Sequence, residues 1–262
     1  MQELGAYRTG AAAIALAVLW LLEGLLPQFQ GRHHRLRHGL HNLALGLLNA
    51  AVVALGFAWA ITWVSEMAAA RGFGLAYQLA WPVWLQWLLV LVLFDLWQYL
   101  WHFLNHHARF LMRFHAVHHA DAELDVTSAL RFHTGEIVLS SVSRLAIVPL
   151  LGMSIPQLLL YESILLPVIL FHHSNVRVPA RLDRALRMLI ATPWMHWVHH
   201  SRIRAERDSN YSSVLSIWDR LFRTFRLRDR PETIELGLDA FATPEAATLR
   251  GMLLQPFQQS WR

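Results

Sequence analysis

The sequence predicts an all-α integral-membrane protein, a bundle of about four to five membrane helices with a helical cap on the cytoplasmic side. Three observations predict this fold. Hydrophobic residues make up 55% of the 262 residues and charged residues only 16%, whereas a soluble domain usually carries about 25% charged residues. Apolar stretches long enough to span a bilayer recur along the chain. Twelve Trp and thirteen Phe suit lipid-facing and interfacial surface.

Several apolar segments are candidates for these helices. Glu23 interrupts the first segment, which also lacks the cleavage site of a signal peptide. The last two form a hairpin that spans the membrane fully or enters it only partly. No repeat or linker stands out, so residues 1–262 are expected to form a single membrane domain. The segments are 9–27, 42–64, 83–101, 135–151 and 157–171.

Basic residues predict the orientation. Arg32, Arg35 and Arg37 lie in the loop 31–38, and such a cluster beside a span is typical of the cytoplasmic side. The second span then leaves the cytoplasm and the third returns, so we expect every later histidine motif and the C-terminus to be cytoplasmic. The net charge of +5 suits anionic lipid headgroups rather than nucleic acid, because the basic residues flank apolar spans.

Histidine is the most unusual part of the composition. Twelve of the sixteen histidines lie between residues 102 and 200, in short motifs. The other four surround the arginines of the basic loop without a repeated spacing, and we expect them to face lipid headgroups. These four are His33, His34, His38 and His41. The motifs are His102-x-x-x-His106-His107, His115-x-x-His118-His119, His133, His172-His173 and His196-x-x-His199-His200.

The spacing of these motifs indicates metal binding. Residues three and four apart share one face of a helix, so His102 and His106 can bind the same ion. Adjacent residues diverge by about 100° on a helix, so neighbouring histidines can point to two different ions. The two H-x-x-H-H motifs, the pair His102 and His106, and one further histidine supply nine imidazoles. This number exceeds what one ion needs and suits two ions with open positions. The chain has no Cys, and imidazole suits zinc, copper and iron alike.

Some acidic residues could support the histidines. Asp95 lies in an apolar helix seven residues before His102, on the same face, and a carboxylate inside a membrane helix is costly. We therefore expect Asp95 to hold a metal-binding histidine through its second ring nitrogen. Glu123, Asp125 and Glu136 are interpreted instead as surface or structural groups.

Two amphipathic segments are also expected. The arginines of 177–190 form one stripe, with leucines mostly on the other side, which is typical of a helix lying on the membrane surface. A dock for an acidic electron-transfer protein is the alternative. The segment 244–258 is expected to be a short helix packed against the domain, through Leu249, Met252 and Phe257.

At the histidine motifs the sequence resembles the fatty acid hydroxylase/sterol desaturase superfamily of membrane di-iron enzymes. The resemblance covers about 88–225, which would be the catalytic core. It rests on H-x-x-x-H at 102–106 and on the segments 113–133 (RFHAVHHADAELDVTSALRFH), 171–179 (FHHSNVRVP), 192–201 (TPWMHWVHHS) and 208–225 (DSNYSSVLSIWDRLFRTF). The sequence departs from the family pattern at Thr134, where Pro is usual, and at Arg223, where Gly is usual.

The resemblance implies two iron ions, dioxygen as co-substrate and a separate electron-transfer protein, such as a ferredoxin, a cytochrome or a reductase. It implies no catalytic residue beyond the metal ligands. The implied ligands are His102, His106, His115, His118, His119, His173, His196, His199 and His200. Additional ligands or supporting residues would be Asp95, His107, His133, His172 and Asn175.

The implied function is hydroxylation of an unactivated C–H bond in a lipid-like substrate with a fatty acyl, sterol or isoprenoid part. Desaturation within the same superfamily is the first alternative. A non-enzymatic membrane protein that binds or transports metal is the second. A transporter is expected to place ionisable residues near the middle of its spans. Here the histidines lie at helix ends and beyond, which argues against transport.

Overall fold

The computed structural model describes residues 2–31 and 34–258, which form helices, turns and loops without a β-strand. Five helices in this part of the chain are long and apolar enough to cross a membrane. The predicted all-α membrane bundle is therefore confirmed, and both helices of the 135–171 hairpin have this length. The five are α1 (Gln2–Leu25), α2 (Arg35–Gly56), α5 (Val83–His107), α7 (Thr134–Leu151) and α8 (Ile155–His173).

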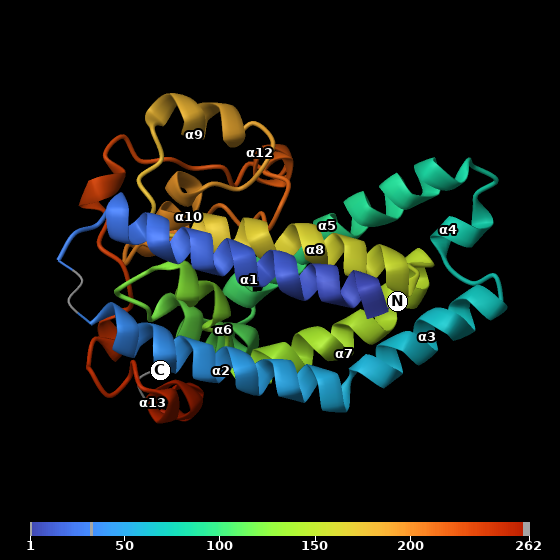
Figure 1. Cartoon of the computed structure of the whole chain (residues 1–262), viewed down its shortest axis with the longest axis horizontal. Coiled ribbons are helices and arrows are strands. Elements are labelled where there is room, and N and C mark those ends of the chain that lie inside the picture. The colour runs from blue at the N-terminus through green and yellow to red at the C-terminus, as the bar shows by residue number, and fades with distance from the viewer. Residues whose placement is uncertain (1, 32–33, 259–262) are drawn as a thin grey trace.

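The long helices run along the long axis of the molecule (Figure 1). Helix α1 packs along α8, and α2 packs along α7. Helices α3 (Ala58–Ala70) and α4 (Leu75–Gln78) lie at the end of the bundle where α5 begins. The chain therefore crosses the bundle repeatedly, and the C-terminal ends of α1, α5 and α8 meet at the opposite end.

A cap of short helices covers that opposite end (Figure 1). The histidine motifs lie there because α5 and α8 both end in histidines, the two H-x-x-H-H motifs lie in or directly after cap helices, and His133 directly precedes α7. The cap elements are α6 (Arg109–His119), η1 (Val126–Leu130), α9 (Ala180–Leu186), α10 (Pro193–His199), α11 (Arg204–Arg207), α12 (Ile217–Leu221), η2 (Pro231–Thr233), η3 (Asp239–Phe241), α13 (Leu249–Leu254) and η4 (Gln255–Phe257).

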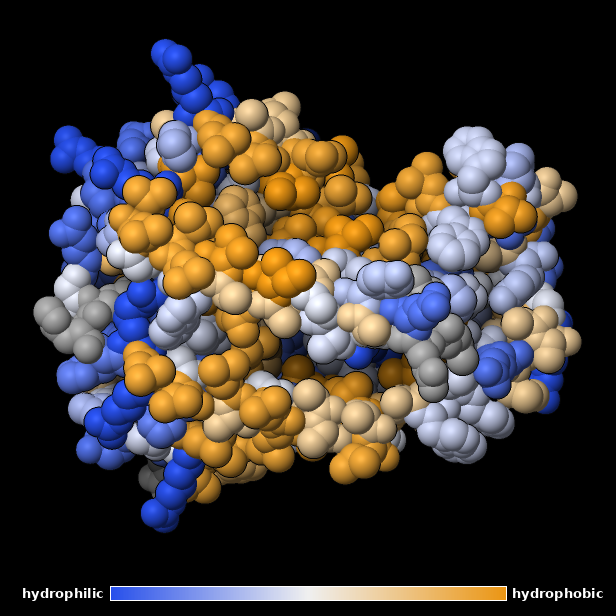
Figure 2. Space-filling model, in the orientation of Figure 1, coloured by the Kyte–Doolittle hydropathy of each residue, from blue (hydrophilic) through white to orange (hydrophobic). Residues whose placement is uncertain are grey.

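Large apolar side chains cover the outside of the bundle. Leu55 is 90% exposed and Trp59 77% exposed, and Figure 2 shows such residues over the middle of one face, with hydrophilic residues at the cap end. A soluble protein rarely exposes so large an apolar surface. Because lipid is the solvent that suits it, the chain is an integral membrane protein.

The second span differs from the sequence-based expectation. Instead of a basic loop followed by a span at 42–64, the helix begins at Arg35 and ends at Gly56, and α3 follows after a break at Phe57. Glu23 does not interrupt α1, which continues to Leu25. The cause is tertiary: Glu23 is buried and accepts a hydrogen bond from Arg35 at 3.0 Å.

His38 is buried rather than directed at lipid headgroups, while His33 lies outside the described residues. The Nε2 of His38 lies 2.9 Å from a carboxylate oxygen of Asp121, and its Nδ1 lies 3.1 Å from a carboxylate oxygen of Asp125. Carboxylates only accept, so both ring nitrogens carry protons and His38 is a cation between two anions. Burial raises the pKa of Asp121, but the positive charges of His38 and Arg131 outweigh it and hold that pKa well below its usual range.

We predict that replacing His38 with Leu destabilises the chain by about 3–5 kcal/mol, because two buried carboxylates lose their shared cation. The measurement is thermal unfolding of the detergent-solubilised protein. His34→Leu is the matched control, since His34 is exposed. Equal unfolding temperatures for the two variants would contradict the role of His38.

Candidate metal centre

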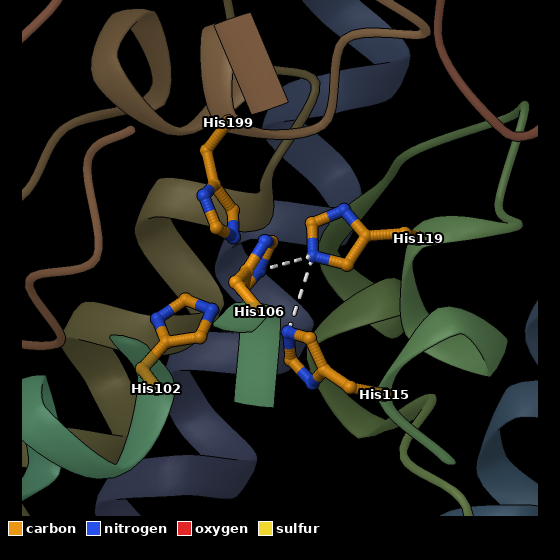
Figure 3. Close-up of side chains that lie close together, drawn as sticks. All are labelled: His102, His106, His115, His119 and His199. Carbon is orange, nitrogen blue, oxygen red and sulfur yellow. Dashed lines mark hydrogen bonds between the residues drawn. The ribbon is translucent and has the colours of Figure 1, made fainter. Parts of the chain in front are cut away.

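Nine buried or half-buried histidines form two adjacent clusters at the cap end of the bundle. Within each cluster the ligand nitrogens lie within 4.8 Å of one another. The first cluster, drawn in Figure 3 with its rings facing a common centre, is His102, His106, His115, His119 and His199. The second cluster is His118, His173, His196 and His200. All nine residues that the resemblance implied as ligands are thus brought together.

Each of the two H-x-x-H-H motifs contributes histidines to both clusters. In 115–119 the first and third histidines join the first cluster, and the middle one, His118, joins the second. In 196–200 the first and third join the second cluster, and His199 joins the first. The helical period explains this division, because residues four apart share a face and adjacent residues diverge. Each motif therefore serves both clusters.

The facing nitrogens have the spacing of ligands to one ion. The Nε2 of His119 lies 3.1 Å from the Nε2 of His106 and 3.1 Å from that of His115. In the second cluster the Nε2 of His196 lies 2.8 Å from that of His173. Two imidazole nitrogens about 2.1 Å from one ion, at a right angle, are about 3.0 Å apart.

Backbone carbonyls set the tautomer of several rings. The Nδ1 of His102 lies 2.9 Å from the carbonyl oxygen of Tyr211, and the Nδ1 of His199 lies 2.6 Å from that of Ser209. A carbonyl only accepts, so each Nδ1 carries the proton and donates it. The Nε2 of a neutral ring is then a bare lone pair. Both Nε2 atoms are buried without a hydrogen-bond partner among the described residues.

Two carboxylates hold other rings of the first cluster. The Nδ1 of His106 lies 3.2 Å from Asp208, and the Nδ1 of His115 lies 2.9 Å from the Oε1 of Glu136. Asn105 also donates to Glu136, at 3.2 Å. A carboxylate on the second ring nitrogen orients a ligand and raises its basicity. Glu136 is buried, so of its two interpretations, as a surface or a structural group, the structural one holds. Asp208 was not singled out from the sequence.

Five histidines of the cap are neutral at pH 7. Burial lowers the pKa of each of the five well below its usual value, and neighbouring imidazoles lower it further. Neutral imidazole is the form that binds metal. Buried lone pairs that face one another need a cation, and nitrogen donors without thiolates suit zinc, copper or iron. The residues therefore fit two metal ions. These five histidines are His118, His119, His196, His199 and His200.

Asp219 holds the loop that carries Tyr211. Its carboxylate accepts hydrogen bonds from the Tyr211 backbone N–H at 2.7 Å and from the Thr224 hydroxyl at 2.8 Å. Arg223 lies in the same turn with φ of 61°, a conformation that favours glycine. This geometry explains the glycine of the family pattern, and here an arginine adopts it.

Asp95 belongs to neither cluster, and its hydrogen-bond partners do not include a histidine of the clusters, although the sequence led us to expect one. Instead it attaches the cap to the bundle. Its carboxylate accepts from the Tyr161 hydroxyl at 2.6 Å, the Trp218 indole at 2.8 Å and the Leu215 N–H at 3.1 Å. These bonds join α5, α8 and the cap. His172, in contrast, lies beside the second cluster, with its ring centroid 4.1 Å from that of His196.

The remaining candidates have other partners. His107 is exposed and stacks on Phe103 at 3.8 Å. His133 caps α7 by accepting from the Gly135 N–H at 2.8 Å. The side chain of Asn175 exchanges two hydrogen bonds with the backbone of Phe29, at 2.8 and 2.9 Å. None of these three belongs to either cluster.

A cavity of ≈ 280 Å³ extends from the clusters into the bundle. Histidines of both clusters and Glu136 line one part of it. Residues of α2, α5, α7 and α8 line the remainder, among them Asn49, Trp101, Ser140, Leu166 and Ile169. On the face shown in Figure 2 the surface is hollowed between α1 and α2.

A membrane-helix bundle that ends in two facing histidine clusters beside a cavity has the architecture expected of a membrane metalloprotein. A family model described as fatty acid hydroxylase matches residues 87–224, more than half of the chain. The chain therefore belongs to the fatty acid hydroxylase family and is an oxidoreductase.

Curated relatives share most of this chain. The ornithine lipid hydroxylase OlsE of Rhizobium tropici is 29% identical over 258 residues, which is 94% of this chain and 74% of the relative. The alkylglycerol monooxygenase of Homo sapiens is 26% identical over 231 residues, 86% of this chain but only 47% of the relative. This chain thus spans about half the length of the human relative. No solved structure matches it.

We predict that Glu136→Ala weakens metal binding about 10- to 100-fold, because His115 loses the acceptor that orients it. The measurement is metal retained per chain after dialysis against graded chelator, by elemental analysis. Glu136→Gln keeps an acceptor oxygen and is expected to retain most of the metal. Equal metal loss from both variants would show that the hydrogen bond to His115 does not matter.

Proposed function

We propose that the chain is a di-iron hydroxylase that inserts oxygen into an unactivated C–H bond of a membrane lipid. One observation carries the proposal: nine imidazoles form two adjacent groups with their ring nitrogens facing inward, beside a cavity that reaches the membrane bundle. The family and the lipid-hydroxylating relatives support iron and dioxygen over the other metals that imidazole binds.

The five histidines of the first cluster would hold one iron and the four of the second cluster the other. Bound iron would supply the activation of dioxygen that C–H hydroxylation needs. The chain's own residues do the positioning. Glu136 and Asp208 hold His115 and His106 by hydrogen bonds, and backbone carbonyls hold His102 and His199.

The cavity would receive the part of the lipid that reacts. Leu165, Leu166 and Ile169 on α8 and Trp101 on α5 supply apolar contacts for an alkyl segment. Asn49, Ser140 and Arg144 offer polar contacts on the other side. The hollow between α1 and α2 suits entry of a lipid directly from the bilayer. The names of the relatives state an ornithine lipid and an alkylglycerol as what they act on, and this supports a lipid substrate here.

We predict that cells that produce the chain form a lipid that carries one oxygen atom from isotopically labelled dioxygen. His118→Ala and His199→Ala, one from each cluster, are expected to lower bound iron and to abolish the product. His107→Ala is the control, since it lies outside both clusters. Comparative lipid mass spectrometry measures the outcome. A product that has lost two hydrogens without label would indicate desaturation, and full activity after stringent iron removal would exclude an iron enzyme.

We further propose that the cap faces the cytoplasm. Outside the five long helices, arginine is concentrated at the cap end, whereas Arg71 lies between α3 and α4 at the other end. Arginine beside membrane spans is retained on the cytoplasmic side. The separate electron-transfer protein would then reach the cap from the cytoplasm.

The chain has no Cys, so single cysteines can report this orientation. We predict that a membrane-impermeant maleimide labels Arg71→Cys in intact cells, but labels Arg181→Cys only after the cells are permeabilised. The reverse pattern would place the cap outside.

A further inference from the structure

A second, basic groove lies on the cap surface, outside the cavity that the proposed function uses. Its volume is ≈ 710 Å³. Five arginines and two aspartates line it, an excess of three positive charges. The arginines come from α6, from the segment before α11 and from α11 itself. They are Arg109, Arg113, Arg202, Arg204 and Arg207.

The groove reaches a residue of the first histidine cluster. His106 lines it, and Asp208, which also lines it, lies 3.2 Å from the Nδ1 of His106. The side chain of Asp208 is 27% exposed, whereas that of His106 is fully buried. One hydrogen bond therefore connects the floor of the groove to the metal-binding ring. The cavity beside the clusters has only Arg144 as a basic side chain other than histidine, and the pocket lined by Trp63 and Arg71 contains no histidine.

The arginines are placed to meet a large acidic partner. The side chain of Arg204 is 81% exposed and that of Arg202 is 37% exposed, and Arg109 is exposed as well. Arg204 lies 3.1 Å from Asp208, and Arg202 lies 3.2 Å from Asp239 and 3.4 Å from Glu235. The two aspartates of the groove are thus paired with Arg204 and Arg202, and the excess positive charge of the groove comes from its other three arginines, Arg109, Arg113 and Arg207. Excess charge of this kind steers an oppositely charged protein to one orientation. The arginine stripe of α9 is less suited, because it lines neither this groove nor the cavity beside the clusters.

We propose that this groove is the docking site of an acidic, one-electron carrier protein, with the partner's cofactor held over Asp208 and His106. The inference rests on the proposed function, in which RH, dioxygen, two electrons and two protons give ROH and water. The carrier supplies the electrons by being oxidised, one electron at a time. Electron transfer slows steeply with distance. Docking is therefore favoured where the path from the partner's cofactor to the histidine clusters is short.

The test uses the full chain in nanodiscs and a reduced, acidic [2Fe–2S] plant-type ferredoxin as the probe. Arg109→Glu/Arg202→Glu reverses two charges on the groove. Arg181→Glu/Arg184→Glu makes the same change in net charge on α9. We expect the groove variant to weaken the Kd for ferredoxin by about ten-fold or more, and the α9 variant to leave it nearly unchanged. Binding to the wild type is expected to weaken as salt rises. Arg109→Glu alone gives the same test if the double variant fails to fold.

Product formation driven by dithionite and methyl viologen separates docking from the reaction itself. The groove variant is expected to keep this activity while its KM for ferredoxin rises. If the wild type forms no product with the chemical reductant, the proposed function fails. Three outcomes overturn the docking proposal: equal losses of ferredoxin binding in both variants, no salt-sensitive binding to the wild type, or a groove variant that loses binding to phosphatidylglycerol vesicles and keeps ferredoxin.

Discussion

The burial of nine imidazoles that face one another is the constraint on which the rest of the structure depends. Neutral, buried lone pairs aimed at a common point are unfavourable unless a cation shares them. The outer nitrogens of four of these rings have acceptors, which are supplied by Tyr211, Ser209, Glu136 and Asp208. The cap loops have the conformations they do because those acceptors must reach the rings from outside.

The membrane bundle holds the cap through buried polar side chains of its long helices. Glu23 at the end of α1 accepts hydrogen bonds from the backbone N–H groups of Val126 and Asn175, at 2.8 and 2.6 Å. Asp95 ties α5 to α8 and to the cap, and His38 on α2 joins two aspartates beside η1. Glu23 and His38 lie near the ends of α1 and α2, whereas Asp95 lies in the middle of α5. The partners of all three are protein groups rather than lipid.

Hydrophobic length predicted the membrane bundle, and helical spacing predicted that the two H-x-x-H-H motifs and the pair His102 and His106 bind metal, because both are local properties. The choice of His173 rather than His172 came from the family resemblance. Helical spacing also predicted that adjacent histidines such as His118 and His119 separate. It did not predict the groups that hydrogen-bond to the outer ring nitrogens of these histidines. Asp208 meets His106 across 102 residues of sequence, and backbone carbonyls have no sequence signature. The burial of His38 and Glu136 likewise depends on partners that only the tertiary fold supplies.

The central claim is that two ions lie side by side, each in its own histidine cluster. Anomalous scattering at the iron absorption edge, measured on crystals of the iron-loaded protein, tests it most directly. The account predicts two neighbouring iron peaks, one among His102, His106, His115, His119 and His199 and the other among His118, His173, His196 and His200. A single peak shared by the two clusters, or iron bound elsewhere, would contradict it.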